Sequence, residues 1–476
     1  MGNLLGKIFK NRLFKAGSLS LISVILVRAI NFISIPVFSR LLTTAEYGNV
    51  DVFVNYANIF MFVMGLDTHA AISKAKLEFK QDSDEYMSSN ILFTTGFAII
   101  IIILINILFN WIQGLFGLDR LTVNIMLVYS YTLYVVLFRT SENNFDYEYK
   151  KNIIMNGTVA IFNVVLSVLL VLTVLNGNRQ IGRILGMTIP TVVCAIIVYI
   201  FICNRGKWKV NKAYIKYAVK FGVPLIPHNL SLVLLSSADR IMIKTMISAS
   251  AAGIYSLSYN LGMLLSVVTE GMNQFFSPWE FRKIDKGKIE DVRRGQRLYL
   301  MVFVIVAVLV MAIAPEIIKI IGSRDYWDGI RIVMWVVFAV FLNFTYTLYV
   351  NIEFFYLKSN WISTGTILAA VINCVLNFFF LKQYGFFFGA ISTVISYGAL
   401  LVFHMIIVNL ILKKRYVDNK FVIIVVIIML AITFGMNMLL SHILLRIICG
   451  IVLAGLTSVI TYIIYKKQGA INFEDE

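Results

Sequence analysis

Two arginines stand inside long apolar stretches of this 476-residue sequence, and their chemistry suits the binding of an anion. Arg28 falls about halfway along the stretch 15–39, and Arg240 falls within the stretch 220–244. An arginine at the centre of a membrane span costs roughly 2.5–3.5 kcal/mol and usually faces an interior cavity. Because a guanidinium group forms bidentate hydrogen bonds to phosphate oxygens, we expect both arginines to contact an anionic head group. The alternatives are an ion pair for Arg28 and an inter-helix lock for Arg240.

Acidic residues in or beside the apolar stretches are candidates for a coupling-ion site or for structural ion pairs. Adjacent helical residues point about 100° apart, so Asp239 need not pair with its neighbour Arg240. Arg139 and Glu142 are three residues apart and are expected to form an ion pair on one helix face. The coupling-ion candidates, each with a structural or interfacial alternative, are Asp51, Asp67, Asp239, Glu270 and Glu353.

No catalytic or metal-binding constellation is expected. The four cysteines all lie inside apolar stretches and lack the C-x-x-C spacing of metal or redox sites. Asp82-Ser83-Asp84 has the acidic spacing of some metal-dependent glycosyltransferases, but it stands in a short loop between apolar stretches. The phosphate-binding Walker motif is absent. We therefore expect a protein that is not an enzyme and has no cofactor, with H⁺ or Na⁺ left open as a coupling ion.

The composition places these residues in a membrane protein. Hydrophobic residues make up 59% of the chain and charged residues only 14%, whereas soluble domains carry about a quarter charged residues. The net charge of +17 comes from basic residues in the connectors between apolar stretches. That distribution favours contact with membrane lipids and argues against nucleic acid as a partner.

The apolar stretches predict an all-α polytopic membrane protein with about 14 transmembrane helices, since a helix of roughly 20 apolar residues spans a bilayer core. Most of the 42 Lys and Arg residues then lie on the side shared by both termini, which the positive-inside rule assigns to the cytoplasm of a bacterial inner (cell) membrane. We expect residues 1–14 to form an interfacial amphipathic segment and residues 467–476 to form a cytoplasmic tail. Pro224 and Pro227 should bend the seventh span. The expected spans are 15–39, 47–70, 88–111, 121–143, 153–175, 183–203, 220–244, 252–276, 297–321, 329–353, 360–381, 386–411, 420–440 and 443–465.

A weak internal repeat suggests how the spans are grouped. One offset pairs Gly48 with Gly253 and Asn55 with Asn260, and it corresponds to six spans. We predict an N-lobe at 15–210 and a C-lobe at 211–415, each a six-helix bundle, followed by two further helices at 416–466. An even number of spans inserts both bundles the same way round, related by a pseudo-two-fold axis along the membrane normal. Two such bundles around a central cleft are typical of alternating-access transporters.

Two motifs resemble those of a known family. The first span ends in Pro36-Val-Phe-Ser-Arg40-Leu-Leu, and Glu46-Tyr47-Gly48 follows; the seventh carries Asp239-Arg240, and Gly253-Ile-Tyr255-Ser opens the eighth. The chain therefore resembles the polysaccharide biosynthesis (Wzx-type) flippases of the multidrug/oligosaccharidyl-lipid/polysaccharide (MOP) exporter superfamily.

The resemblance implies a function in cell-surface polysaccharide synthesis. It implies transfer of an undecaprenyl-pyrophosphate-linked oligosaccharide, a repeat unit of capsule, O-antigen or exopolysaccharide, to the outer leaflet. A polysaccharide polymerase and its chain-length machinery are the expected partners. The alternatives are a lipid II flippase of peptidoglycan synthesis, a cation-coupled drug antiporter, which typically has fewer spans, and a membrane polysaccharide polymerase. The short loops of this chain count against the polymerase.

Overall fold

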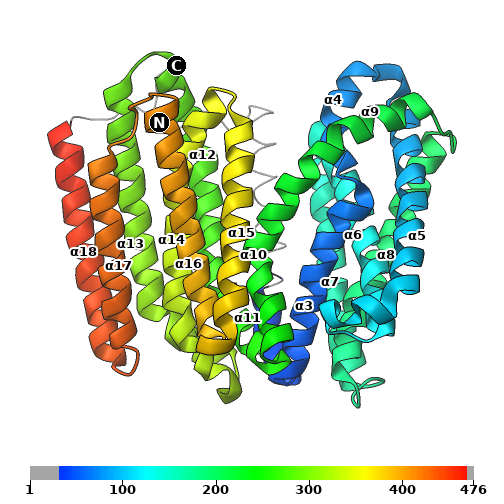
Figure 1. The fold of residues 1–476 in the computed structure, drawn as a ribbon, viewed down its shortest axis with the longest axis horizontal. Helices are drawn as coiled ribbons and strands as arrows, with labels where there is room; N and C mark the ends of the chain where they lie inside the picture. Colours follow the sequence, from blue (N-terminus) through cyan, green and yellow to red (C-terminus); the bar gives the residue numbers. More distant parts are fainter. Residues whose placement is uncertain (1–29, 31, 469–476) are drawn as a thin grey trace, which may run out of the picture. The chain divides into compact units, whose positions relative to one another are not determined.

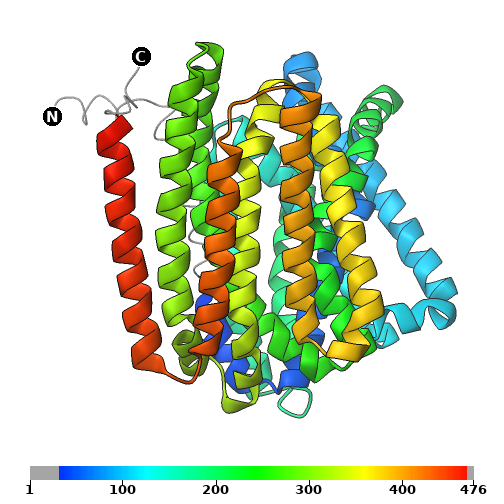
Figure 2. The ribbon, with the colours of Figure 1, turned by 60° about the vertical axis from the view of Figure 1, so that its left-hand side comes forward.

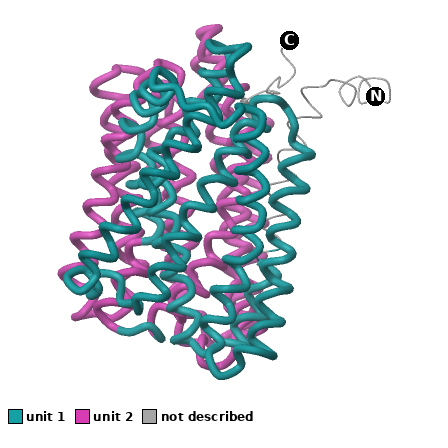
Figure 3. The backbone as a smooth tube through the Cα atoms, turned by 90° about the vertical axis from the view of Figure 1, so that its right-hand side faces the viewer, with its two compact units in different colours: residues 1–237, 248–250 teal, residues 238–247, 251–476 magenta. Residues whose placement is uncertain are grey.

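The computed structural model describes residue 30 and residues 32–468, and this part of the chain is helical with short connections (Figure 1). It divides into two compact units, which Figure 3 colours separately. Unit 1 comprises Met1–Ser237 with Ser248–Ser250, and unit 2 comprises Ala238–Ile247 with Ala251–Glu476. The boundary between them falls inside one helix, α10, so the predicted lobe limits and the pseudo-two-fold axis stay predictions.

From residue 32 on, the first element of unit 1 is the short apolar helix Phe32–Leu41. Its remaining elements are α3 (Thr44–Gly65), η1 (Thr68–Ala71), α4 (Ile72–Glu78), η2 (Lys80–Asp82), α5 (Ser83–Phe116), α6 (Arg120–Phe145), α7 (Tyr149–Leu172), α8 (Arg179–Arg205), α9 (Lys212–Gly222), η3 (Val223–Leu225) and the first part of α10 (Ile226–Met246).

Unit 2 contains the end of α10, all but the first two residues of α11, and the helices that follow. They are α11 (Ala249–Met263), α12 (Leu265–Asp285), α13 (Ile289–Ile321), η4 (Arg324–Gly329), α14 (Ile330–Phe355), α15 (Ser359–Tyr384), α16 (Phe387–Ile406), the π-helical turn η5 (Ile407–Ile411), α17 (Asn419–Met438) and α18 (Ile443–Gln468). Figure 2 shows α18, in red, running alongside α13, against which it packs.

The prediction of an all-α polytopic membrane protein is confirmed. Within residues 32–468, 12 helices are long and apolar enough to cross a membrane, or 13 if the bent pair Thr44–Gly65 and Thr68–Glu78 counts as one span. These 13 correspond in order to the predicted spans from 47–70 onward. Most of the predicted first span, the segment 1–14 and most of the tail 467–476 lie outside the described residues.

Two breaks in the helices of unit 1 pack against each other. The chain bends by 55° between α3 and the η1–α4 segment, where Leu66 and Asp67 take left-handed φ values of 48° and 53°. The second break follows Gly222 and coincides with Pro224 and Pro227, as the prolines predicted. A Cβ atom on Gly222 would lie 2.5 Å from the carbonyl oxygen of Leu66. Glycine at this position therefore permits the close approach of the two breaks.

Helices in the two units differ in what surrounds them. The side chains of Ile107 and Trp111 on α5 are 70% and 88% exposed, so this helix presents an apolar face for lipid. By contrast, α14 is buried on nearly all sides within unit 2 and packs against α12, α13, α16 and α17. Aromatic stacking contributes to that core, because the rings of Phe303 and Phe344 lie 3.8 Å apart.

A buried carboxylate holds four elements of unit 1 together. Glu142 on α6 is completely buried and pairs with Arg139, which confirms the expected ion pair on one helix face. Its Oε1 atom also lies 3.3 Å from Lys76 Nζ on α4 and 3.1 Å from Arg205 Nη1 on α8. Arg205 pairs in turn with Asp84 on α5. The network joins α4, α5, α6 and α8.

The substitution Glu142→Gln should lower the free energy of unfolding by about 3–5 kcal/mol, because it leaves the buried Arg139 without its counter-charge. Thermal or chemical unfolding of the purified protein in detergent measures this loss. The control is Glu148→Gln, which removes an exposed pair with Lys151 and should cost at most about 1 kcal/mol. Equal losses in the two variants would contradict the assignment of a structural role to Glu142.

Candidate functional site

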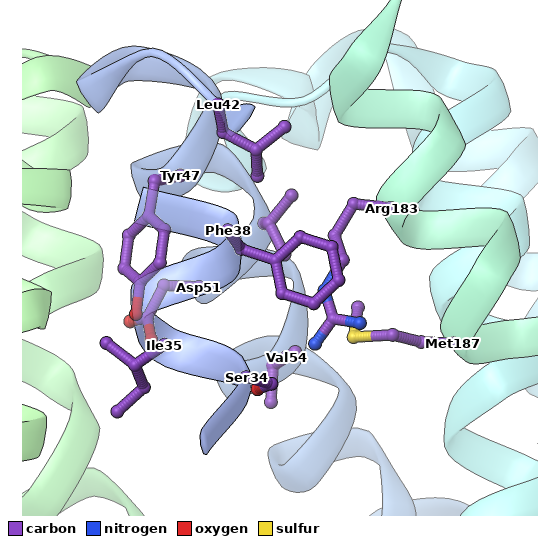
Figure 4. A pocket seen from close by; sticks show the side chains of 10 residues that line it. Ser34, Ile35, Phe38, Leu42, Tyr47, Asp51, Val54, Arg183 and Met187 are labelled. Atoms are coloured by element: carbon purple, nitrogen blue, oxygen red, sulfur yellow. The ribbon is translucent and has the colours of Figure 1, made fainter. Parts of the chain in front are cut away.

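A cavity in unit 1 brings an arginine and an aspartate from distant parts of the sequence to one place (Figure 4). The cavity has a volume of about 110 Å³ and is lined by the helix Phe32–Leu41, α3 and α8. Most of the lining side chains are apolar. Its polar side chains are Ser34, Tyr47, Asp51 and Arg183.

Arg183 of α8 is the cation of this cavity and is partly buried. Its guanidinium carbon lies 3.8 Å from the centre of the Phe38 ring, and Figure 4 shows the two side chains next to each other. Its Nη1 atom donates to Ser167 Oγ at 2.8 Å and to the carbonyl oxygen of Asn163 at 3.4 Å. These partners are neutral, and no carboxylate in the described part of the chain forms an ion pair with Arg183.

Close packing of two helices positions Arg183. Gly186 lies one turn after Arg183, and a Cβ atom there would lie 2.3 Å from Ser167 Cα on α7. The absence of a side chain at Gly186 lets α7 approach α8 closely enough for Ser167 to accept the hydrogen bond. The Asn178 side chain caps the start of α8 by accepting from the backbone N–H of Ile181. The direction of the arginine is therefore set by helix packing.

Asp51 and Asp67 occupy different surroundings in unit 1. Asp51 lines the cavity and accepts a hydrogen bond of 2.8 Å from Asn55 Nδ2. Asp67 is completely buried at the break after α3, where Asn229 Nδ2 donates to it at 2.6 Å and His69 Nδ1 lies 3.0 Å away. Arg28, which is expected to contact a head group or alternatively to form an ion pair with a carboxylate such as Asp51 or Asp67, lies outside the described residues, so its role stays a prediction.

Asp239 and Arg240 face different partners in unit 2. Asp239 is completely buried and accepts hydrogen bonds from the hydroxyl groups of Tyr255 on α11 and Thr393 on α16. Arg240 is 8% exposed; its Nη1 atom donates to Asn260 Oδ1 at 3.3 Å, and its guanidinium carbon lies 4.8 Å from the Tyr259 ring centre. These contacts favour the inter-helix alternative for Arg240, and its contact with a head group stays a prediction.

The two remaining acidic candidates differ in exposure. Glu270 lies on an exposed position of α12. Glu353 is completely buried on α14, and its Oε1 atom lies 2.7 Å from Nδ1 of His404 on α16. His404 is also buried and packs against Gly365 of α15, where a Cβ atom would lie 2.7 Å from its Nε2 atom. Glu353 therefore lies buried among three helices.

Sequence reasoning missed two residues that the structure places in its interior. Arg183 is the first residue of the predicted span 183–203, although α8 begins four residues earlier at Arg179. Glu280 lies beyond the end of the predicted span 252–276. In the structure, α12 continues through Pro278 to Asp285, and Glu280 is completely buried.

Similarity to solved structures defines the class of fold. The chain superimposes on the lipid II flippase MurJ in an inward-closed conformation with a TM-score of 0.70 and 14% identity, over 93% of this chain and 98% of that one. An inward-facing multidrug-resistance MATE-family transporter of the MOP superfamily gives a TM-score of 0.63 and 12% identity, over 83% and 99% of the chains. The protein therefore has the fold of the MOP-superfamily transporters.

The sequence places the chain more narrowly within this class. A model of the polysaccharide biosynthesis protein family matches residues 13–279, more than half of the chain, so the protein belongs to that family. A Haemophilus influenzae protein named for the Lsg locus is 23% identical over 371 residues, 76% of this chain and 89% of its own length. A second protein from that species, described as an uncharacterized membrane protein, is 24% identical over 370 residues, 76% of this chain and 88% of its own. The expected family is thereby confirmed.

The substitution Asp239→Ala should destabilise unit 2 by about 1–3 kcal/mol, because it leaves buried hydroxyl groups of Tyr255 and Thr393 without their shared acceptor. Asp239→Asn keeps an acceptor oxygen in nearly the same shape and should cost less. Unfolding of the purified variants in detergent measures both losses. A loss as large in the Asn variant as in the Ala variant would show that the negative charge, rather than the hydrogen bonds, stabilises this contact.

Proposed function

We propose that the protein carries an undecaprenyl-pyrophosphate-linked oligosaccharide from the cytoplasmic to the outer leaflet of the cell membrane by alternating access. Membership of the polysaccharide biosynthesis family and the fold of MOP transporters support this proposal. The lipid tail stays in the bilayer while the pyrophosphate and the sugars pass through the protein. The glycan is a repeat unit of a surface polysaccharide, which a polymerase and its chain-length machinery would then extend.

The observation that carries this proposal is the position of Arg183 in the unit 1 cavity, which Asp51 also lines without forming an ion pair with it. Arg183 lines it without a carboxylate partner among the described residues. An arginine inside a membrane protein is costly to keep and usually contacts a partner or a substrate. Its remaining N–H groups fit the oxygens of a phosphate or of an acidic sugar. The volume of about 110 Å³ suits one small charged group rather than a whole oligosaccharide.

Further cations would complete the path of the head group. Arg28 remains the proposed cavity cation of the first span, and Arg240 the proposed cation of unit 2. The membrane potential favours outward movement of such an anion by about 2.3 kcal/mol per charge per 100 mV. The membrane potential therefore assists export without ATP. A coupled ion would add to this driving force.

Deletion of the gene tests the proposed cargo. Cells without this protein should accumulate the lipid-linked oligosaccharide in the cytoplasmic leaflet, measured by its accessibility to a membrane-impermeant glycan-binding probe in oriented membrane vesicles. Unchanged delivery to the outer leaflet, in a strain that has no paralogue, would refute the proposal. Loss of viability with accumulation of lipid II would instead identify a lipid II flippase.

The substitution Arg183→Gln should reduce transport about 10- to 100-fold, because a charged hydrogen bond contributes about 1.5–3 kcal/mol and each 1.4 kcal/mol is a factor of ten. Arg183→Lys keeps the charge without the bidentate geometry and should be intermediate. The matched control is Arg179→Gln, one turn earlier on α8, where the exposed arginine donates to the carbonyl oxygen of Leu41.

Transport in vesicles, normalised to the amount of each variant in the membrane, measures these effects. An Arg183→Gln variant as active as the Arg179→Gln control would exclude Arg183 from the path of the head group.

A further inference from the structure

A buried carboxyl group in unit 2 has no role in the mechanism above. Glu280 lies on α12, five residues before the helix ends at Asp285, and its side chain is completely buried. Its Oε1 atom accepts a hydrogen bond of 2.6 Å from Gln296 Nε2 on α13. Its Oε2 atom accepts one of 3.0 Å from Asn351 Nδ2 on α14. Each oxygen is thus held by a neutral amide from a different helix.

The surroundings of Glu280 contain no opposite charge in contact with it. Within the described chain, its hydrogen-bond partners are the amides of Gln296 and Asn351, and it forms no ion pair. The basic residue one turn later on its own helix, Lys283, lies 3.9 Å from Asp291 of α13. Glu280 therefore differs from Glu142, which contacts three cations.

Other titratable groups on the facing helices do not supply a positive charge to Glu280. Tyr299 of α13 is a neutral neighbour whose ring stacks on Phe276 and Phe344. Glu353, two residues after Asn351 on α14, is itself acidic and is held by His404. A carboxylate in such an environment is costly, whereas a neutral carboxylic acid is not. The site therefore favours binding of a proton.

The amide of Gln296 allows Glu280 to keep a partner in both protonation states. Its Nε2 atom donates to the carboxylate, while its Oε1 atom is buried and has no hydrogen-bond partner in the structure. Rotation of the amide by half a turn would direct Oε1 toward Glu280. This oxygen would then accept a hydrogen bond from the neutral carboxylic acid. Loss or gain of that proton changes the contacts between α12 and α13.

We propose that Glu280 is a proton-binding site, and that its protonation and deprotonation change the packing of α12 against α13 and α14 during transport. The proton is the only species bound or released. Proton binding follows from the surroundings of Glu280 alone. Its coupling to transport rests on the proposed function.

Infrared difference spectroscopy of the purified full-length protein tests proton binding directly. Between about pH 5 and pH 9, the range that includes buried glutamates, the wild type should show a carboxylic acid C=O band that disappears as the pH rises. Glu280→Gln should lose this band, and Glu280→Asp, which keeps a carboxyl group, should shift it. The matched control Glu290→Gln, at a half-exposed glutamate that pairs with Arg293 and Arg294, should retain it.

The infrared result and the transport result have separate meanings. A band unchanged by Glu280→Gln, or a Glu280 that stays ionised over the whole pH range, would overturn the proton site whatever the protein carries. If the site titrates, the transport rate of the wild type should depend on pH, and that dependence should be lost in Glu280→Gln and kept in Glu290→Gln. A pH dependence that persists in Glu280→Gln would overturn the coupling. Absence of lipid-linked oligosaccharide transport in the wild type would refute the proposed function and leave the proton site intact.

Discussion

The cost of placing charge inside an apolar helical bundle is the constraint on which this structure depends. Only 14% of the residues are charged, and those that are buried in the described chain mostly have a compensating partner. Glu142 contacts three cations, and the completely buried Arg446 of α18 pairs with Glu316 of α13. These ion pairs hold helices together, because a charged side chain facing lipid without a partner would be costly.

The same constraint separates the functional candidates from the structural pairs. Arg183 and Glu280 are held by neutral hydrogen-bond donors and acceptors, one in each unit. A cation without an acid suits an anionic ligand, and an acid without a cation suits a proton.

The positions of the helices from span 47–70 onward could be predicted from the sequence. The residues that line the cavity around Arg183 could not. Length and hydropathy determine which segments cross a bilayer, so the predicted spans from 47–70 onward each match a helix or a bent pair. Pro224 and Pro227 also indicated the break before α10. The predicted span 252–276 ends short of Glu280, whereas α12 continues through Pro278 to Asp285 and buries Glu280. The cavity around Arg183 depends on contacts between α8, α3 and the helix Phe32–Leu41, which no local pattern encodes.

The central claim is that the head group of a lipid-linked oligosaccharide binds to an arginine that the protein leaves without an acidic partner. A cryo-EM structure of the full-length protein bound to this lipid tests the claim most directly. The account predicts a phosphate or acidic-sugar oxygen within hydrogen-bonding distance of the Arg183 guanidinium group. A head group bound elsewhere, with Arg183 paired to a carboxylate of the protein, would contradict it.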